Sequence, residues 1–382
     1  MEFKIKGSKD RFEAALELEE PDTLPIFEMG ITPPIMSKII DRTPYYRNYE
    51  LMLEGYSKGK YKEVNRKWVM DEIECHRKLG LDAIRLAVHY ILPSDIVVKR
   101  VGEHTWQIGE SQWRYLPDIN VLWPLDSIVQ RGPEAVLRYI KEHWDETKSV
   151  HESRVEPVEI ASKEVGDEMM IIGDADGTFL SHGPGMSIML SWMYTHPDVV
   201  RKYIDWDTRR EITYGKAQID AGAEAIFMSR DYAFNSGPFM SPKHFHEFIA
   251  PSLKRHVNAF HRKGAYAIKH TDGNINLILD DIVDSGIDAL QCLDPGAGMR
   301  IGEVKEKYGD KICLMGNMNI DTLSRKSVEE VEEEAKRCIR DASPGGGHIF
   351  CTSNDIATSV KFENFLAMIN TARKYGKYPI KR

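Results

Sequence analysis

The sequence predicts an α/β fold: a single (β/α)8 TIM barrel with an insertion between its second and third strands. Three observations predict it. Eight short apolar runs recur along the chain, most runs are followed by polar residues with Gly, Pro or Asn, and most intervening segments have helical periodicity. Strands that alternate with helices form a parallel sheet with right-handed crossovers. Eight such units favour closure into a barrel over the alternative, a doubly wound open sheet.

The apolar runs define the expected strands in chain order. They are Leu24–Met29, Leu81–Val88, Met169–Asp174, Glu224–Ser229, Ala265–His270, Asp288–Leu293, Ile312–Gly316 and His348–Cys351. Two intervening helices have clear start signals. Ser327 and Glu330 form a capping box before an apolar stripe. Ser241-Pro242 joins an N-cap to a proline at the first position of a helix extending to about Arg262.

One stretch departs from the repeating pattern. Residues 95–123 alternate apolar and polar side chains, which predicts a small β excursion, and a helix is expected near Pro133–Glu146. We therefore expect one barrel domain over residues 1–382, carrying an insertion at about 95–150. Gly345-Gly346-Gly347 precedes the last strand, so it is predicted to be a turn at the end opposite the active site.

Composition excludes several classes of protein. The chain of 382 residues, 42% hydrophobic, is long enough to bury a large core. Its net charge of −8 comes from 51 basic and 59 acidic residues that are well mixed, so we expect no nucleic-acid partner. No apolar run reaches the ~20 residues of a membrane span, and the first residues lack the apolar stretch of a signal peptide. Five cysteines without CxxC spacing argue against disulfides, so a cytoplasmic location is expected.

Polar and ionisable residues follow nearly every expected strand. In a (β/α) barrel the catalytic groups sit at this end, where strands pass into loops. The residues at these positions are Glu28, His89, Asp174, Asp176, Arg230, Asp231, His270, Asp272, Asp294, Asn317, Asn319, Cys351, Asn354 and Asp355.

His270 and Asp272 form the sharpest of these signals. An imidazole and a carboxylate two residues apart at a strand end project to the same side, where they can share a metal or a proton. In the alternative, Asp272 caps the next helix and His270 bonds to a backbone carbonyl. Cys351 is either a thiolate ligand or a small buried hydrophobe.

Each of the other candidate site residues also has a structural interpretation beside the functional one. Arg230 and Asp231 either bind substrate or form an ion pair that orients their loop. Asp174 and Asp176 either include a general acid or serve as turn residues. The stretch with Met186, Met189, Trp192 and Met193 is either core or a lid. A partly aromatic pocket for a flat organic substrate is expected from Phe179, Tyr232, Phe234 and Phe239.

The second half of the chain resembles the uroporphyrinogen decarboxylase superfamily. The resemblance rests on SGPFMSPKHFHEFIAPSLKR, KHTDGNINLILDDIVDSGIDAL, YGDKICLMGNMNIDTL and GGGHIFCTSNDIATSVKFENFLAMINTARKYGKY, in that order. It implies a (β/α) barrel and one of two activities, decarboxylation of porphyrinogens or corrinoid-dependent methyl transfer.

Two departures favour the methyltransferase branch. Decarboxylases of the superfamily carry an RQAGR-like segment after the first strand, whereas residues 28–34 here contain no arginine. Their aspartate after the second strand is replaced by the stretch Arg85–Tyr90 (RLAVHY). An acidic loop is a poor ligand for a substrate with many carboxylates. If the chain were a decarboxylase, Arg85, Arg230 or Lys269 would have to bind the carboxylates.

The methyltransferases that act on coenzyme M hold zinc with an H-x-C motif and a later cysteine. The matching positions here are His270, Asp272 and, by register, Asn354, with Cys351 three residues away. Fewer thiolates make a harder, more Lewis-acidic site or one without metal. This change suits relatives that demethylate a methoxylated substrate, because the leaving oxygen must then be protonated or metal-bound.

The resemblance therefore implies methyl transfer to cobalt from a small methylated substrate, a class that includes methoxyaromatic compounds. The chain has no DxHxxG-type segment, so a partner corrinoid protein would supply the corrinoid (cobalamin), with zinc as an additional cofactor and a homodimer as an expected assembly. A docking module without activity is a further alternative. The expected catalytic residues are His270, Asp272, Asp176 and Glu28. The expected metal ligands are His270, Asp272 and Cys351. The expected substrate-binding residues are Arg230, Asp231, Tyr232, Phe234, Phe179, His89, Asn317 and Asn354.

Overall fold

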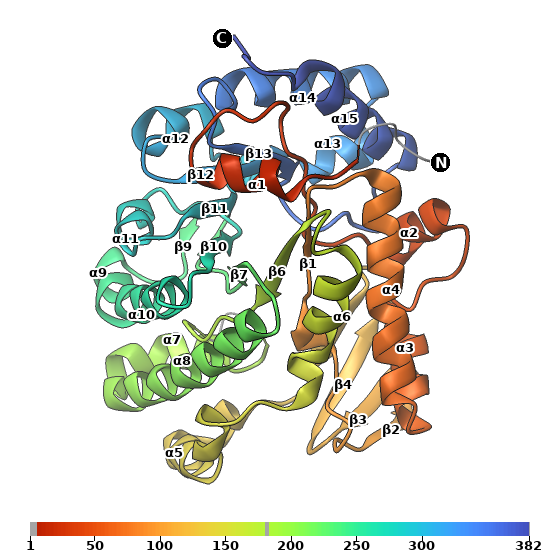
Figure 1. The fold of residues 1–382 in the computed structure, drawn as a ribbon. Coiled ribbons are helices and arrows are strands. Elements are labelled where there is room, and N and C mark those ends of the chain that lie inside the picture. Colours follow the sequence, from red (N-terminus) through yellow and green to blue (C-terminus); the bar gives the residue numbers. More distant parts are fainter. Residues whose placement is uncertain (1–5, 180–182, 382) are drawn as a thin grey trace.

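The computed structural model describes residues 6–179 and 183–381 and contains a curled, seven-stranded parallel sheet (Figure 1). Its strands, in spatial order, are β1 (Ala83–Arg85), β6 (Met170–Asp174), β7 (Ala225–Met228), β10 (Tyr266–Thr271), β11 (Ala289–Cys292), β12 (Cys313–Met318) and β13 (His348–Thr352). Each strand coincides with an apolar run of the sequence. The α/β class and the parallel sheet are thereby confirmed.

The first expected strand, Leu24–Met29, is an extended segment rather than a regular strand. It forms a single parallel bridge from Ile26 to Phe350 of β13. On its other side the Asp82 amide, just before β1, donates to the Ile26 carbonyl at 3.0 Å. The segment thus contacts residues at both edges of the sheet. Closure into an eight-stranded barrel stays a prediction.

Helices surround the curled sheet (Figure 1). They include α2 (Pro33–Ile40), α3 (Tyr49–Ser57), α4 (Tyr61–Leu79), α6 (Glu156–Val165), α7 (Met186–Thr195), α8 (Pro197–Asp220), α11 (Leu279–Asp284), α12 (Ile301–Tyr308), α13 (Ile320–Arg325), α14 (Val328–Ala342) and α15 (Phe362–Tyr375). The capping box at Ser327 is present at the start of α14, and the apolar stripe of that helix is buried.

The helix expected from Pro242 to about Arg262 forms in three pieces. They are α9 (Pro242–His244), a π-helical turn (Phe245–Ile249) and α10 (Ala250–His261). Pro251 lies in the first turn of α10. Because proline has no amide proton, it cannot donate to the preceding turn, and the helical hydrogen-bond pattern changes there.

The insertion contains a four-stranded antiparallel sheet between β1 and β6. Its strands are β2 (Val98–Gly102), β3 (Thr105–Ile108), β4 (Ser111–Leu116) and β5 (Val121–Pro124), and α5 (Pro133–Glu142) follows. The β excursion predicted over residues 95–123 is therefore present. A separate short hairpin, β8 (Ala233–Phe234) and β9 (Gly237–Pro238), follows β7.

The concave face of the sheet encloses a small apolar core. Alternate strand residues supply it, among them Ile172, Phe227 and Ile268, and α1 (Lys9–Leu16) covers it with Phe12 and Leu16. Successive strand side chains point to opposite faces, so residues two positions further along point inward again. At the carboxyl ends of the strands these inward positions carry polar residues. They are Arg85, Asp174, His270, Gln291 and Asn317.

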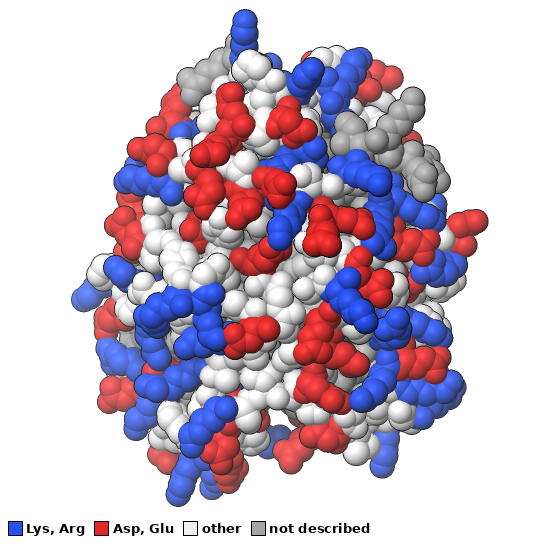
Figure 2. Space-filling model, viewed as in Figure 1, with Lys and Arg blue, Asp and Glu red and all other residues white. Residues whose placement is uncertain are grey.

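The outer surface carries both signs of charge. On the face seen in Figure 2, acidic and basic side chains are interspersed, as the mixed sequence predicts. Within residues 6–179 and 183–381, the helices are all too short or too polar to cross a membrane.

Candidate functional site

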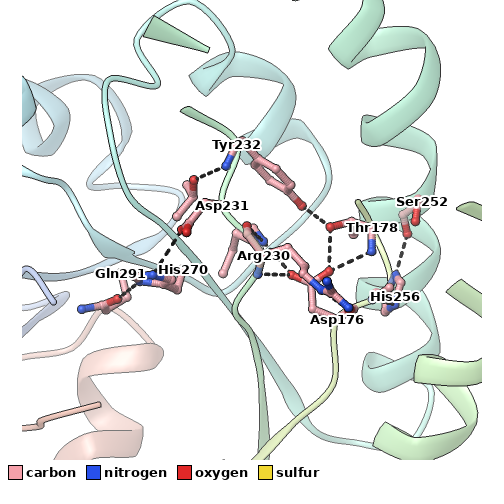
Figure 3. A network of polar contacts seen from close by, with 12 residues as sticks. Asp176, Thr178, Arg230, Asp231, Tyr232, Ser252, His256, His270 and Gln291 are labelled. Carbon is pink, nitrogen blue, oxygen red and sulfur yellow. Dashed lines mark hydrogen bonds and ion pairs between the residues drawn. The ribbon is translucent and has the colours of Figure 1, made fainter. Parts of the chain in front are cut away.

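His270 lies near the carboxyl end of β10, the middle strand of the sheet, and contacts Gln291 and Asp231 (Figure 3). Its Nδ1 forms a short hydrogen bond with Oε1 of Gln291, the residue beside it in register on β11. The Gln291 amide nitrogen donates to the Thr352 carbonyl at 3.1 Å, so the Gln291 oxygen must face the histidine. Nδ1 of His270 therefore carries the proton, and Nε2 is directed elsewhere.

Two carboxylates face Nε2 of His270. Oδ1 of Asp231 lies 3.5 Å away and Oδ1 of Asp272 lies 3.6 Å away. Burial lowers the pKa of His270, but the charges of Asp272 and Asp231 outweigh it and raise that pKa above its ordinary value. Burial, opposed by His270 and reinforced by Asp231, raises the pKa of Asp272 to about 6.

These three side chains have the arrangement of a metal site. One ligand atom from each of Asp231, His270 and Asp272 lies within 4.8 Å of the others. The hydrogen bond that Nδ1 donates to Gln291 is the outer contact that metal-bound histidines usually have, and it leaves Nε2 as the ligand atom. Two carboxylates and one imidazole suit zinc or another divalent cation. The residues therefore fit a metal.

Asn354 joins this cluster from the end of β13. Its Nδ2 donates to Oδ2 of Asp272 at 2.5 Å. Asn354, which the resemblance matches to the later zinc-binding cysteine of the coenzyme M methyltransferases, thus contacts Asp272 of this cluster. Cys351 differs, since it is fully buried in the inner core and contacts the Gln291 amide at 3.9 Å.

Glu28 and the Asn354 carbonyl share contacts with one hydroxyl, that of Thr352. The hydroxyl of Thr352 lies 2.6 Å from the Asn354 carbonyl, which can only accept. The same hydroxyl forms a second, short contact with Oε2 of Glu28. A threonine hydroxyl has one proton, so it can donate to only one of these two oxygens at a time.

The surroundings of Glu28 agree with a neutral carboxylic acid. Its side chain is 1% exposed, and burial raises its pKa to about 8, against the smaller opposing effect of the Thr352 hydrogen bonds. Its other oxygen, Oε1, has no hydrogen-bond partner among the described residues. Thr352 and Asn354 connect Glu28 to Asp272, so the acid belongs to the same polar network.

Asp176 lies in a buried part of the polar network next to this cluster (Figure 3). Its carboxylate accepts hydrogen bonds from the Lys269 ammonium at 2.7 Å, the Arg230 amide at 2.9 Å and both donors of Thr178. Burial raises the pKa of Asp176, but Lys269 outweighs it and the pKa is lowered. Asp176 is therefore an anion whose oxygens are already bonded within the protein.

The cations at this end of the sheet are also occupied. Arg85 is paired with Asp174 in a buried ion pair, with Nε to Oδ2 at 2.8 Å. His89 contacts the other oxygen of Asp174 at 3.0 Å. Lys269 is bound to Asp176, and the Arg230 guanidinium donates to the Asp176 carbonyl at 3.1 Å. Arg85, Arg230 and Lys269 are thus committed to internal partners.

The expected aromatic residues fall into two groups. Phe179 and Tyr232 are fully buried, and the Tyr232 hydroxyl bonds to Thr178. Phe234, 55% exposed, packs edge-on against Phe239 at 4.5 Å between ring centres. A groove of about 460 Å³ adjoins the hairpin, and its lining includes Met193, Tyr194, Phe239, Met240, His244 and Leu277. Met189, Trp192 and Met193 of α7 are buried, as core packing predicts.

Four remaining strand-end residues have structural partners. Asn317 is buried and donates to the Leu293 carbonyl at 2.8 Å. Asp294 and Asn319 cap the short helices that follow them. Asp355 pairs with buried Arg47 at 2.6 Å.

Sequence reasoning missed Gln291 and Thr352. Gln291 lies on an expected strand but was not singled out because a lone amide in an apolar run is a weak signal. Strand side chains alternate between the two faces of a sheet, and Gln291 pairs in register with His270. This alternation therefore places Gln291 on the same inner face as His270.

Comparisons with known proteins give relatives of two kinds. Over 227 residues the chain is 26% identical to the methylcobamide:CoM methyltransferase MtaA of Methanosarcina barkeri, covering 58% of this chain and 63% of that protein. The chain thus spans less than two thirds of the MtaA sequence. Over 312 residues it is 23% identical to the uroporphyrinogen decarboxylase of Chlorobaculum parvum, covering 78% of this chain and 80% of that protein.

A solved structure and a family model complete the comparison. A methyltransferase from Methanosarcina mazei superposes with a TM-score of 0.67 at 20% identity, covering 97% of this chain and 99% of that one, which supports the fold. The family model described as uroporphyrinogen decarboxylase (URO-D) matches residues 135–375, more than half of the chain. The chain therefore belongs to the uroporphyrinogen decarboxylase family.

Proposed function

We propose that this protein is a corrinoid-dependent methyltransferase built on a barrel that segment 24–29 closes. It moves a methyl group from a small methylated, methoxyaromatic-type substrate to the cobalt of a partner corrinoid protein. The observation that carries the proposal is the polar network at the strand ends. This network joins a metal-type cluster of Asp231, His270 and Asp272 to a neutral acid, Glu28.

Asp231, His270 and Asp272 would hold a divalent cation such as zinc. The cation would act as a Lewis acid toward the oxygen that loses its methyl group. Gln291 keeps Nε2 of His270 directed at the two carboxylates, and Asn354 fixes Asp272. The corrinoid, when its carrier protein is bound, supplies the methyl-accepting cobalt.

Glu28 would serve as the proton donor of the site. An alkoxide or phenolate is a poor leaving group, and protonation of its oxygen removes that difficulty. A donor must hold its proton near neutral pH, and burial, which raises the pKa of Glu28 to about 8, favours this. We therefore assign the acid role to Glu28 rather than to Asp176, whose pKa is lowered.

Phe234 and Phe239 offer an apolar surface for the ring of a substrate. Phe234 follows Asp231 by three residues and is exposed. The Asn274 amide, two residues after Asp272, donates to the Phe234 carbonyl at 2.9 Å. The hairpin is thereby tied to the loop that carries Asp272, close to the proposed chemistry.

The occupied cations argue against the alternative of decarboxylation. A multiply carboxylated substrate needs free arginines or lysines. Arg85 and Lys269 are instead neutralised by buried aspartates. Releasing either cation would leave an unpaired charge in the protein, at a cost of several kcal/mol.

The direct test combines the protein with a reduced corrinoid protein and methoxyaromatic donors. We expect the absorbance of methylcobalamin to appear, and His270→Ala and Asp272→Ala to abolish it along with bound metal. The surface variant His261→Ala is the matched control and keeps both. Conversion of uroporphyrinogen to coproporphyrinogen, with no methylcobalamin, would overturn the proposal.

A further inference from the structure

Arg154 is an arginine without an ion pair, and it lies against the turn that follows β1. It ends a short 3-10 helix, Glu152–Arg154, just before α6. Its Nη1 donates to the Val88 carbonyl at 2.7 Å, and its guanidinium lies 5.7 Å from the centre of the Tyr214 ring. Within the described ranges of the chain, no carboxylate oxygen lies within 4 Å of this guanidinium. Most of its five N–H donors are therefore left for a ligand.

The acidic groups near Arg154 are bound to other cations. Glu211 acts on it most strongly among the carboxylates, but Glu211 pairs with Arg210 at 3.0 Å. Asp174 also acts on it, and Asp174 is held by Arg85. Burial lowers the pKa of Arg154, and these carboxylates offset only part of that effect. A partly buried cation without a counter-charge favours the binding of an anion.

His89 places a ring nitrogen at the same turn. Val88 and His89 are consecutive residues of the 3-10 helix Val88–Tyr90, so the guanidinium of Arg154 lies against the peptide that leads to His89. Nδ1 of His89 contacts Asp174 at 3.0 Å, whereas Nε2 forms no hydrogen bond with any described residue. The side chain is 38% exposed. Its Nε2 is therefore accessible to a ligand.

This pair lies across the strand ends from the metal-type cluster. Asp174, which contacts His89, ends β6, whereas His270 lies on β10, and β7 runs between these strands. Neighbouring strands are about 4.8 Å apart, so the two positions are separated by about 10 Å. Phe227 of β7 contacts both sides, because its ring lies 4.3 Å from the Arg85 guanidinium and stacks on His270 at 5.8 Å. A para-substituted aromatic ring that contacts a metal at one end and a hydrogen-bond donor at the other covers such a separation.

We propose that Arg154 and His89 form an anion subsite for the carboxylate of the methyl donor, which is then a methoxylated aromatic acid. This inference rests on the proposed function and specifies its substrate class. The planar guanidinium of Arg154 matches the two oxygens of a carboxylate. The methoxy oxygen would then lie at the metal-type cluster. One free arginine suits one acidic group, which agrees with the argument against a multiply carboxylated substrate.

Binding of the carboxylate should be coupled to protonation of His89. Burial lowers the pKa of His89, Asp174 opposes this effect, and Arg85 and Arg154 add to it. The Tyr90 ring packs on the imidazole at 3.9 Å between ring centres. A carboxylate beside Nε2 favours the protonated imidazole, which can donate a second hydrogen bond to it. The anion should therefore bind more tightly as the pH falls.

Calorimetric titration of the full-length protein, without corrinoid, tests the subsite with two probes of the same shape. They are 4-methoxybenzoate, which is charged, and 4-methoxybenzamide, which is neutral. The wild type should bind the benzoate roughly tenfold or more tightly than the benzamide. Arg154→Gln should weaken benzoate binding by about tenfold to a hundredfold and leave benzamide binding unchanged. Arg138→Gln, at an exposed position, is the matched control and should bind both probes as the wild type does.

The wild type alone provides a second measurement that needs no variant. Its affinity for the benzoate should rise between about pH 8 and about pH 6, and its affinity for the benzamide should stay constant. Equal affinities for the two probes at both pH values, or binding of neither probe, would overturn the subsite.

Methylcobalamin formation is scored separately from binding. Benzoate binding that depends on Arg154, without methylcobalamin, would count against the methyltransferase and leave the subsite intact. Methylcobalamin formed equally well from both probes would support the methyltransferase and overturn the subsite.

Discussion

Replacing Glu28 with glutamine tests the neutral acid directly. The amide of Glu28→Gln can still form a hydrogen bond with the Thr352 hydroxyl, and it does not titrate. The shape and the hydrogen bond are therefore kept while the ionisation is removed. The two proteins should differ in how their stability depends on pH.

The size of the expected difference in pH dependence follows from the pKa of Glu28, which is about 8 in the folded chain and 4.5 ordinarily. Between these values the folded protein keeps a proton that the unfolded chain has lost, so wild-type stability falls as the pH rises. The stabilising contribution is full below pH 4.5 and is lost as the pH rises through about 8. From about pH 5 to about pH 8 the loss is on the order of 3.5 kcal/mol, at 1.36 kcal/mol per pH unit.

Denaturant unfolding at both pH values measures this difference. Between these pH values the wild type should lose on the order of 3.5 kcal/mol of unfolding free energy relative to Glu28→Gln, so the variant gains relative stability at high pH. Other buried acids titrate in both proteins and cancel. Glu54→Gln, at an exposed position, should give a curve parallel to the wild type. Parallel curves for Glu28→Gln as well would refute a protonated Glu28.

Two further changes test the surroundings of the site. Lys269→Met should lower the unfolding free energy by about 3–5 kcal/mol, because Asp176 would be left buried without its cation. Lys58→Met, at an exposed ion pair, should cost about 1 kcal/mol or less in the same urea titration, and equal losses would contradict the argument. Gly30→Ala should lower stability by roughly 1–3 kcal/mol, since its Cβ would overlap the Arg47 head group. An unchanged melting temperature would show that this loop can move aside.

Most of the fold could be predicted because strands buried on both faces consist of short apolar runs. Seven of the eight expected strands form within the predicted runs or within two residues of them. The run at Leu24–Met29 is equally apolar, but it makes only one bridge to β13. An apolar run predicts that a segment is buried. It does not predict how many backbone hydrogen bonds the segment forms with a neighbouring strand.

The site was predictable to the level of which loops converge. Their position at strand ends predicts His270, Asp272, Asp231 and Asn354 as site residues, and these four lie in one network. The same rule predicts Asp176, yet its carboxylate bonds to Lys269. Strand-end position predicts at which end of the sheet a residue lies. After the last hydrogen bond between strands, the conformation of the loop determines which residue the side chain contacts.

Cys292 illustrates why side-chain direction at a strand end resists prediction. Period-two alternation assigns Gln291 to the inner face and therefore turns Cys292 away from it. The positive φ at Cys292 reverses this assignment, and its accommodation depends on Gly316, 24 residues later in the chain. No local pattern around Cys292 encodes that space. The direction of the Cys292 side chain, which contacts Asp272, therefore becomes visible only when β11 and β12 are packed side by side.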